Sequence, residues 1–415
     1  MIEKKHVVVI GCGIVGVSAA IWLQRDGHKV TLIDRVGPAG GTAYGNAGVL
    51  AASSVVPVTV PGLIGKVPRM LLNSASPFFL IWSYLPKMLP WLFKYLSHTN
   101  IESNRRIAKA LFPLLNDSLL QHQALSLGTG AERFVVPGNF HVAYQNKAAF
   151  LADKLVWQLR RELGYEWEEL GSKALQAAVP ILQEGSGFGV RLNNHGRISD
   201  PGEYVRTLAK HVVQQGGELR VGDVSDVIVE QGAVNAVKCN DKIILCDAAV
   251  VATGAWSGPL TQRLGFRVPL ETERGYHIEF INPSAMPDGP ILIASGKFIV
   301  APMEGRIRCA GIVEFGGLTA AASRKPLELL KQSAKSLMPD LKYDRIDEWM
   351  GHRPAPADSI PYIGEVPSAS GAFVAFGHHH VGLTAGAKTG RIVADLIANR
   401  NTDLNLVPYA ILRSC

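Results

Sequence analysis

Residues 7–35 constrain the fold of this chain more than any other stretch of its sequence. Val7 to Ile10 form a short β-branched run, which is typical of a buried parallel strand. A second apolar run, Lys29 to Ile33, ends at Asp34. Between the two runs, three glycines in G-x-G-x-x-G spacing open a helical pattern: Gly11, Gly13 and Gly16. This order of elements predicts a Rossmann-like βαβ unit that binds a dinucleotide.

Each part of this unit has a physical role. The first glycine permits the tight turn, the second lets the backbone approach a pyrophosphate, and the third lets the helix approach the strand. The helix N-terminus holds the phosphate charge, and Asp34 can accept hydrogen bonds from a ribose 2′-hydroxyl, which disfavours NADP. The motif alone does not distinguish FAD from NAD. The expected dinucleotide contacts in this unit are Gly11, Gly13, Ile14, Val15, Gly16, Asp34 and Arg35.

Composition excludes several other classes of protein. The 415 residues leave room for two or three domains. The five cysteines are scattered without a C-x-x-C pair, which indicates reduced thiols and favours the cytoplasm, as does the lack of a signal-peptide pattern before the first strand. The net charge of +7 comes from dispersed Lys and Arg, with no basic run that would indicate nucleic-acid binding.

Four further stretches follow the βαβ unit in a characteristic order. They are GPAGGTAYGNAG (37–48), AAVVATGAWS (248–257), GHRPAPADSIPYIG (351–364) and FGHHHVGLTAGAKTGRIVADLI (376–397). Together with residues 7–35 they resemble the D-amino-acid oxidase superfamily of FAD-dependent oxidoreductases, which includes glycine and sarcosine oxidases. The closest likeness is to bacterial D-amino-acid dehydrogenases, and it covers essentially the whole chain. The resemblance implies FAD as the cofactor.

The resemblance also implies an α/β fold with an α+β substrate domain. A Rossmann-like FAD domain is expected from the separate segments 1–60, 195–260 and 350–415. A substrate domain with a large mixed or antiparallel sheet is expected from 61–194 and 261–349. The apolar 248–251 run needs a parallel partner, which the first unit offers, and Val221 to Val229 are expected to lie beside that unit as well.

Several of these stretches are expected to touch the cofactor. The small residues of 41–48 suit a backbone lying against a flat ring, although such a stretch could also be a flexible linker. A helix starting near Thr384 would point its positive end at the flavin pyrimidine edge, as the family does, or could be an ordinary capped surface helix. The expected contacts are Thr42, Asn46, Ala47, Gly48, Val224, Thr253, Gly254, Trp256, Gly351, Gly377, Gly382, Leu383 and Thr384.

Oxidation of an amino acid at Cα moves a hydride to flavin N5, so the protein must anchor the carboxylate. A planar guanidinium suits this task, and Arg353 lies in the segment that resembles the family's carboxylate-binding arginine. Tyr276 could add a hydroxyl or could be a core strand residue. The expected catalytic residues are Arg353, Tyr276 and His379, and the expected substrate-binding residues are Arg353, Tyr276, His277, Arg274 and His380.

The run His378 to His380 raises the question of a metal site. Consecutive residues of an extended chain point to opposite faces, and no further ligand stands at zinc-like spacing. No metal is therefore expected, and one of these histidines is expected near the flavin instead.

The chain has no acidic residue between Val36 and Ile101. Within this stretch, PFFLIWSYLPKMLPWLFKYL (77–96) is aromatic and basic, but Lys87 and three prolines interrupt it too often for a membrane span. Such a composition suits contact with an anionic membrane surface, with Trp91 expected on the contact face and with Lys66, Arg69 and Lys94 nearby. The alternative is a pair of short helices that covers the substrate site.

These observations favour FAD-dependent oxidation of D-amino acids, or of a secondary amine such as a D-proline derivative, to the imino acid. An acyclic imine would hydrolyse to the 2-oxo acid and ammonia, and the electrons would pass to a quinone or respiratory acceptor at the inner face of the membrane. An oxidase that makes hydrogen peroxide is the alternative in the same class. A pyridine-nucleotide-dependent reductase or hydroxylase would require a second strand-linked G-x-G-x-x-G, and GSGFG (185–189) lacks that context.

Overall fold

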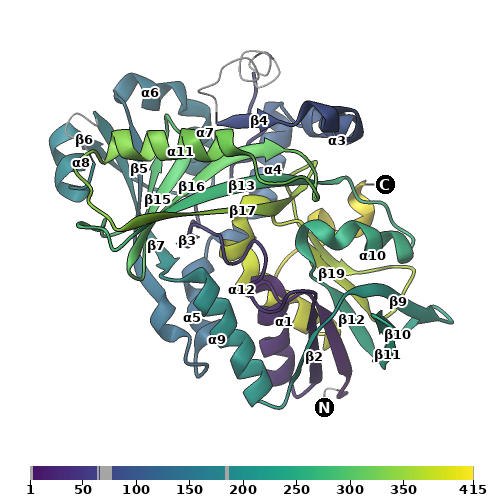
Figure 1. The fold of residues 1–415 in the computed structure, drawn as a ribbon. Helices are drawn as coiled ribbons and strands as arrows, with labels where there is room; N and C mark the ends of the chain where they lie inside the picture. Colours follow the sequence, from purple (N-terminus) through teal and green to yellow (C-terminus); the bar gives the residue numbers. More distant parts are fainter. Residues whose placement is uncertain (1–2, 63–64, 66–76, 183–186, 415) are drawn as a thin grey trace.

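The computed structural model describes residues 3–62, 65, 77–182 and 187–414 and contains two large β-sheets with helices packed around them (Figure 1). Lys66, Arg69, Cys415 and the first two residues of 185–189 lie outside the described residues.

The first sheet has six strands in the order β18-β19-β12-β1-β2-β8 and contains the predicted βαβ unit. Its strands are parallel except for the antiparallel β18–β19 pair. β12 pairs with β1, as the sequence predicts. The strands are β1 (His6–Ile10), β2 (Lys29–Asp34), β8 (Glu218–Val221), β12 (Ala248–Val251), β18 (Tyr362–Glu365) and β19 (Ala372–Phe376).

Both faces of the six-stranded sheet are covered. Val7 and Val9 of β1 pack with helices α1 (Ile14–Arg25), α9 (Pro201–Gln214) and α12 (Gly382–Ile397). Val8 and Ile10 pack on the other face, against α10 (Ser257–Arg263) and the three-stranded sheet of β9 (Val224–Glu230), β10 (Ala233–Cys239) and β11 (Lys242–Leu245). This double burial explains why residues 7–10 of β1 and all of β12 are apolar.

The expectation that Val221 to Val229 lie beside the first unit is wrong for most of that run. The strand next to β2 is β8, which pairs Glu218 to Val221 with Thr31 to Asp34. After Val221 the chain leaves this sheet, and β9 pairs with β10 instead. Only Val227 of β9 is buried, and the other residues of this strand are partly or fully exposed, as is common in an antiparallel ribbon at the surface.

The second sheet has ten strands and is mixed, as expected. Eight follow the order β17-β13-β16-β15-β14-β5-β7-β3, while β4 pairs with β16 and β6 with β7. The β14–β5 and β16–β4 pairs are parallel. The strands are β3 (Val49–Leu50), β4 (Phe78–Leu80), β5 (Val135–Tyr144), β6 (Glu168–Gly171), β7 (Phe188–Ile198), β13 (Leu270–Ile281), β14 (Ile291–Ile293), β15 (Phe298–Met303), β16 (Arg306–Phe315) and β17 (Arg345–Pro356).

Helix α11 (Arg324–Leu337) lies along one face of the ten-stranded sheet (Figure 1). The other α-helices that lie wholly within the described residues are α3 (Leu85–Ser97), α4 (Ile101–Leu115), α5 (Ser118–Ser126), α6 (Lys147–Ala152), α7 (Lys154–Glu162) and α8 (Ser172–Ala178). The residue limits of the two expected domains stay a prediction.

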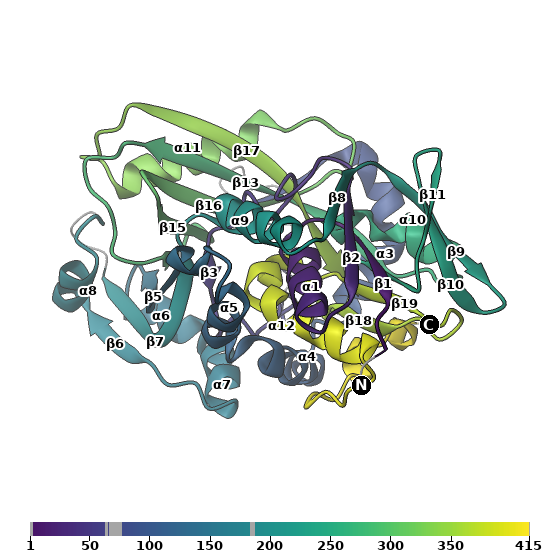
Figure 2. The same cartoon turned by 90° about the horizontal axis from the view of Figure 1, so that it is seen from below.

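Helices from opposite ends of the sequence lie side by side, because α12 packs directly on α1 (Figure 2). A Cβ on Gly386 would lie 2.9 Å from the side chain of Ile14, and a Cβ on Gly390 would lie 2.5 Å from the backbone of Ala19. The second contact is closer to the C-terminus than the first in both helices, so the two helices are parallel. The two helix N-termini therefore lie at the same end of the pair, beside the carboxyl edge of the six-stranded sheet.

Candidate functional site

The turn after β1 is shaped for close approach of backbone. Gly11 has φ +112°, and a Cβ there would lie 2.4 Å from the carbonyl oxygen of Ala252. A Cβ on Gly16 would lie 1.9 Å from the carbonyl oxygen of Gly11, whereas a Cβ on Gly13 would meet nothing within 4 Å. Helix α1 begins without a side-chain cap or an acidic residue in its first turn. The open space at Gly13 and these free N–H groups fit the pyrophosphate of a dinucleotide.

Asp34 lies beside this turn and holds two loops through its carboxylate. Its Oδ2 accepts a hydrogen bond from the N–H of Cys12 at 2.8 Å, and its Oδ1 accepts from the N–H groups of Val36 and Gly37 at 2.9 and 3.0 Å. The neighbouring guanidinium of Arg35 lies 3.7 Å from the ring centroid of Trp256. Two of the predicted cofactor segments therefore meet at the carboxyl edge of the six-stranded sheet.

We expect Asp34→Ala to be purified largely without cofactor. The substitution removes the carboxylate that accepts hydrogen bonds from three backbone N–H groups and, in the bound state, from the dinucleotide ribose. Asp34→Asn keeps an oxygen for part of these bonds and should retain more cofactor. The measurement is the ratio of absorbance at the flavin and protein bands after dialysis at limiting FAD. Full occupancy in Asp34→Ala would remove Asp34 from the cofactor site.

The segment 41–48 is held against the ten-stranded sheet, which does not support a flexible linker. The hydroxyl of Thr42 donates to the carbonyl of His352 at 2.7 Å. The carbonyls of Tyr44 and Asn46 both accept hydrogen bonds from Arg308 Nη1. Packing also explains the glycine at position 45, because Gly45 and Gly351 of β17 both lie against the ring of Trp349. A Cβ on either glycine would lie about 2 Å from atoms of that ring.

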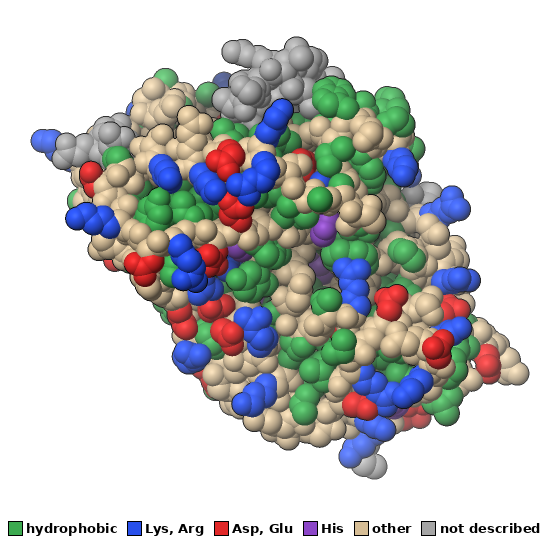
Figure 3. All heavy atoms as spheres, in the orientation of Figure 1, with side chains coloured by type: hydrophobic (Ala, Val, Ile, Leu, Met, Phe, Trp, Pro, Cys, Tyr) green, Lys and Arg blue, Asp and Glu red, His purple; other side chains and the backbone are tan. Residues whose placement is uncertain are grey.

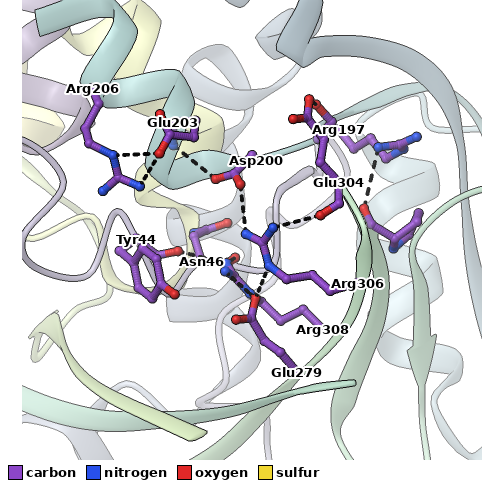
Figure 4. A network of polar contacts seen from close by, with 12 residues as sticks. Tyr44, Asn46, Arg197, Asp200, Glu203, Arg206, Glu279, Glu304, Arg306 and Arg308 are labelled. Atoms are coloured by element: carbon purple, nitrogen blue, oxygen red, sulfur yellow. Dashed lines mark hydrogen bonds and ion pairs between the residues drawn. The ribbon is translucent and has the colours of Figure 1, made fainter. Parts of the chain in front are cut away.

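The guanidinium of Arg308 belongs to a buried network, drawn in Figure 4. Its Nε and Nη2 donate to Glu279 Oε1 at 2.9 and 2.7 Å, and Arg306 Nε donates to the same oxygen at 2.7 Å. Arg306 Nη2 also donates to Oδ2 of Asp200, which caps the N-terminus of α9. The network therefore joins segment 41–48, the ten-stranded sheet and a helix of the six-stranded sheet.

Arg353 lies on β17 with few partners of its own. Its guanidinium packs over Gly275 of β13, where a Cβ would lie 2.4 Å from Cζ. Its hydrogen bonds to the carbonyls of Ile312 and Gly311 are long, at 3.3 and 3.5 Å. Among the described residues no carboxylate lies within 4.0 Å of it. A half-buried guanidinium with weak partners retains donors for an anion.

A short helical turn brings histidines to Arg353. Strand β19 leads into η4 (His379–Val381), which lies against β17 and precedes α12. The Nε2 atom of His379 lies 2.7 Å from Oε2 of Glu273, out of alignment for a hydrogen bond, and its Nδ1 lies 3.3 Å from Nδ1 of His380. His379 has φ +50°, a conformation that is strained for a residue with a side chain.

The premise that His378 to His380 are extended is therefore wrong, because residues 379–381 form a 3-10 turn with the rings of His379 and His380 4.8 Å apart. His378 is buried and its Nε2 lies 3.0 Å from the hydroxyl of Thr389, and burial lowers the pKa of its imidazole to about 3. No cluster of three metal-ligating side chains occurs among the described residues.

The family model described as FAD dependent oxidoreductase matches residues 6–396. The chain belongs to this family. It is 40% identical over 420 residues to the D-amino-acid oxidase of Bradyrhizobium diazoefficiens, with 100% of each chain covered. It is 30% identical to D-amino acid dehydrogenase 2 of Ralstonia nicotianae, with 98% of this chain and 100% of that relative covered. Its fold matches the glycine oxidase from Geobacillus kaustophilus with a TM-score of 0.79 at 20% identity, covering 100% of both chains.

These findings confirm the expected superfamily and FAD as the cofactor. In this FAD-dependent oxidoreductase, Leu383 and Thr384 lie in the first turn of α12, and the first turn contains no acidic residue. The carbonyl of Leu383 lies 2.8 Å from Nε2 of His122, and the hydroxyl of Thr384 donates to the carbonyl of Val49 at 3.3 Å. The predicted segments 41–48, 253–256 and 377–384 thus surround one edge of the six-stranded sheet. Their contacts with FAD stay predictions.

The structure does not bring Tyr276 and Arg274 to Arg353. In the register of β13 with β17, Glu273 lies directly opposite Arg353. Arg274 and Tyr276 are one and three positions further along β13, so their side chains point to the other face of the sheet. There the hydroxyl of Tyr276 donates to Glu314 Oε2 at 2.6 Å, and Arg274 Nη1 lies 2.9 Å from the same carboxylate oxygen. Tyr276 therefore has the position of a core strand residue.

His277 shares the face of Arg353 but is engaged with the backbone. Its Nδ1 lies 3.1 Å from the carbonyl oxygen of Gly45, and its ring stacks on Trp349 with centroids 5.0 Å apart. Burial, with the nearby Arg308, lowers its pKa to about 3. His277 is thus a neutral support of segment 41–48, and Val224 lies in β9, outside the six-stranded sheet.

Sequence reasoning missed Glu273, Glu279 and Arg308. A usable signal was present in ETERGYHIEF (271–280), where the odd-numbered positions other than Gly275 are all polar or charged: Glu271, Glu273, His277 and Glu279. Such alternation in a strand indicates one polar face. Since residues 271–280 are all buried, that polar face is an internal one.

The apolar segment 77–96 covers the end of this polar face. Its residues form β4, η1 (Trp82–Tyr84) and α3 instead of a pair of helices. Trp91 and Tyr95 pack with Phe315 and Ala355 of the ten-stranded sheet, and the indole N–H of Trp91 donates to the carbonyl of Ala355 at 2.9 Å. The expectation that Trp91 lies on an exposed contact face is therefore wrong, because helical periodicity turns it to the sheet.

Proposed function

We propose that this chain is an FAD-dependent D-amino-acid dehydrogenase that oxidises its substrate at Cα to the imino acid. Water then releases the 2-oxo acid and ammonia from an acyclic imine, and a secondary amine of the D-proline type gives a cyclic imine. The electrons pass to a quinone or another respiratory acceptor. The proposal is supported by relatives that are named D-amino-acid dehydrogenases or oxidases and match 98–100% of the chain.

Arg353 is the observation that carries this proposal. FAD, when bound, accepts the hydride that leaves Cα, so the task of the protein is to orient Cα and to bind the carboxylate. Arg353 offers a guanidinium with long hydrogen bonds, with no carboxylate within 4.0 Å among the described residues, beside the turn that precedes α12. Bidentate pairing would fix the carboxylate in one plane, which orients the carbon attached to it.

The test is anaerobic mixing of the FAD-loaded protein with a panel of D- and L-amino acids, D-proline and NADH. We expect the flavin absorbance to bleach with D-amino acids or D-proline and to persist with the L-enantiomers and with NADH. Bleaching by NADH alone would favour a pyridine-nucleotide-dependent reductase. Bleaching by L-enantiomers alone would contradict the proposed stereochemistry.

An oxidase is the second candidate, because the relative at 40% identity is named a D-amino-acid oxidase. The two functions differ in the step that reoxidises the flavin. The same reduced protein should be mixed with oxygenated buffer and, separately, with a soluble quinone under nitrogen. Faster reoxidation by the quinone supports the dehydrogenase, and stoichiometric hydrogen peroxide with oxygen supports the oxidase.

We further propose that the outer face of α3 contacts an anionic membrane surface, where a quinone would be available. Leu89 and Phe93 of α3 are exposed, with exposed fractions of 37% and 70%, and Trp82 of the preceding η1 is 61% exposed. Lys87 and Lys94 are exposed on the same segment. Hydrophobic side chains gather over this part of the molecule in Figure 3. No helix among the described residues is long and apolar enough to cross a membrane.

Phe93→Glu is expected to weaken binding to phosphatidylglycerol-containing vesicles, because it places a charge in the apolar face and reverses the local attraction to anionic lipid. Activity with a soluble dye should be unchanged. Leu120→Glu is the matched control, since Leu120 is 65% exposed on α5, away from this segment. Vesicle co-sedimentation measures both variants, and equal binding by Phe93→Glu and the wild type would contradict the membrane contact.

A further inference from the structure

A buried carboxylate beside Arg353 has no role in the function proposed so far. Glu273 of β13 is the direct register partner of Arg353 on β17, and its exposed fraction is 4%. The two side chains share a face of the sheet but do not form an ion pair with each other within 4.0 Å. Arg353 is directed to the carbonyls of β16, and Glu273 is directed to His379. One cation and one anion therefore lie side by side without neutralising each other by direct contact.

We propose that Glu273 binds the ammonium group of the substrate while Arg353 binds its carboxylate, so that the site selects zwitterionic α-amino acids over carboxylic acids of the same shape. This inference rests on the proposed function, because it assumes that Arg353 is the carboxylate anchor. It adds a second, oppositely charged residue that determines specificity.

The geometry of the two strands suits a zwitterion. Directly opposed residues of antiparallel strands have Cβ atoms about 5 Å apart, so their charged groups can reach two substituents of the same small molecule. An α-amino acid carries its carboxylate and its ammonium on a single carbon. The arrangement also orients that carbon, because two charged contacts fix it more completely than one.

The charges of the site favour the same ligand. Burial raises the pKa of Glu273, but the neighbouring His379 and Arg353 outweigh burial and hold the pKa of this carboxyl below its usual value. Glu273 is therefore ionised at neutral pH. A bound zwitterion would pair both charges, whereas a simple carboxylate would pair Arg353 and leave Glu273 facing an apolar group, which is unfavourable in a buried site.

Among the described residues no lysine or arginine lies within 4.0 Å of Glu273, and His379, at 2.7 Å, is out of alignment for a hydrogen bond. Tyr95 of α3 closes the site from the side of segment 77–96, and burial followed by the charge of Glu273 raises the pKa of its phenol well above the usual value, so it stays neutral. Glu271, two residues away on the same face, is bound instead to the hydroxyl of Tyr84 at 3.0 and 3.1 Å. Glu273 is thus the carboxylate of this face that lies next to Arg353.

The test compares two ligands that cannot be oxidised, because neither has a hydrogen on C2: 2-aminoisobutyrate and its amine-free counterpart pivalate. Calorimetric titration of the FAD-loaded wild type should give tighter binding of 2-aminoisobutyrate by about 10- to 100-fold, as expected for one charge-assisted hydrogen-bonded contact. In Glu273→Gln the preference should fall to a few-fold, through weaker binding of 2-aminoisobutyrate and equal or tighter binding of pivalate.

Glu271→Gln is the matched control and should keep the wild-type preference, since Glu271 lies on the same strand and face and is also buried. An unchanged preference in Glu273→Gln, while Arg353→Leu abolishes binding of both ligands, would overturn the role of Glu273 and leave the proposed function standing. Binding of both ligands that is insensitive to Arg353→Leu would overturn the proposed function itself. Equal affinities of the two ligands for the wild type would overturn the inference without any variant.

Discussion

Arg353→Leu is expected to fold and to retain FAD, yet to lose about 10²- to 10³-fold in kcat/KM for the best D-amino acid. The reason is that a carboxylate loses a charge-assisted, paired contact in a partly closed site, where truncation of one partner costs about 3–5 kcal/mol. Both kcat and KM should change, because the same contact orients Cα. Steady-state kinetics with a soluble dye as acceptor measure this effect.

Two further variants test this interpretation of Arg353. Arg353→Lys should recover only part of the loss, since a point charge does not reproduce a planar fork. Arg345→Leu is the matched control, because Arg345 lies on the same strand β17 but is exposed and paired with Asp347. Near-native kinetics of Arg353→Leu on every D-amino acid would place the anchor elsewhere. Arg274 would not replace it, since its guanidinium is held by Glu314 on the opposite face.

The nucleotide-binding end of this molecule could be predicted from the sequence because its signals are local. The glycine spacing, the helix and Asp34 lie within 28 consecutive positions, from Val7 to Asp34, and each has a physical requirement that the structure meets. The pairing of β12 with β1 followed from the need of a wholly apolar strand for two covered faces. Both inferences needed no knowledge of long-range register.

The substrate side could not be predicted in the same way, because β13 is buried along almost its whole length. In a half-exposed strand the contrast between polar and apolar positions identifies the inner face, but here Tyr276 and Glu273 are equally buried on opposite faces. Only the register with β17 decides which of them meets Arg353. The expectation that Trp91 is exposed was wrong for a related reason, because an aromatic and basic composition does not indicate which aromatic residue packs against the sheet.

The pairing of Arg308 with Glu279 depends on long-range register, because the two residues come from neighbouring strands. Arg308 in turn binds the carbonyls of Tyr44 and Asn46, which lie 264 and 262 positions away in the sequence. Arg308 has an exposed fraction of 0% and Glu279 one of 3%. Burial raises the pKa of Glu279, but Arg308 and Arg306 outweigh it, so the carboxyl stays ionised. The pair therefore acts as a charged clamp on the carbonyls of Tyr44 and Asn46.

Arg308→Leu should lower the free energy of unfolding by about 3 kcal/mol, the lower end of the range for breaking a buried pair, because Arg306 still contacts Glu279. It should also release FAD, since the carbonyls of Tyr44 and Asn46 lose their donor and segment 41–48 loses its hold. Urea denaturation of the apoprotein and FAD titration measure the two effects separately.

The double variant Arg308→Leu/Glu279→Leu separates the loss of the hydrogen bonds to segment 41–48 from the loss of charge balance in the buried pair. Removing both partners leaves no uncompensated carboxylate, and Arg306 keeps its contact with Asp200, so most of the lost stability should return. The affinity for FAD should stay low, because the two carbonyls of segment 41–48 still lack their donor. Recovery of FAD affinity together with stability would show that Arg308 acts only through the charge balance of the sheet, and the proposed contact of segment 41–48 with the cofactor would then lose its support.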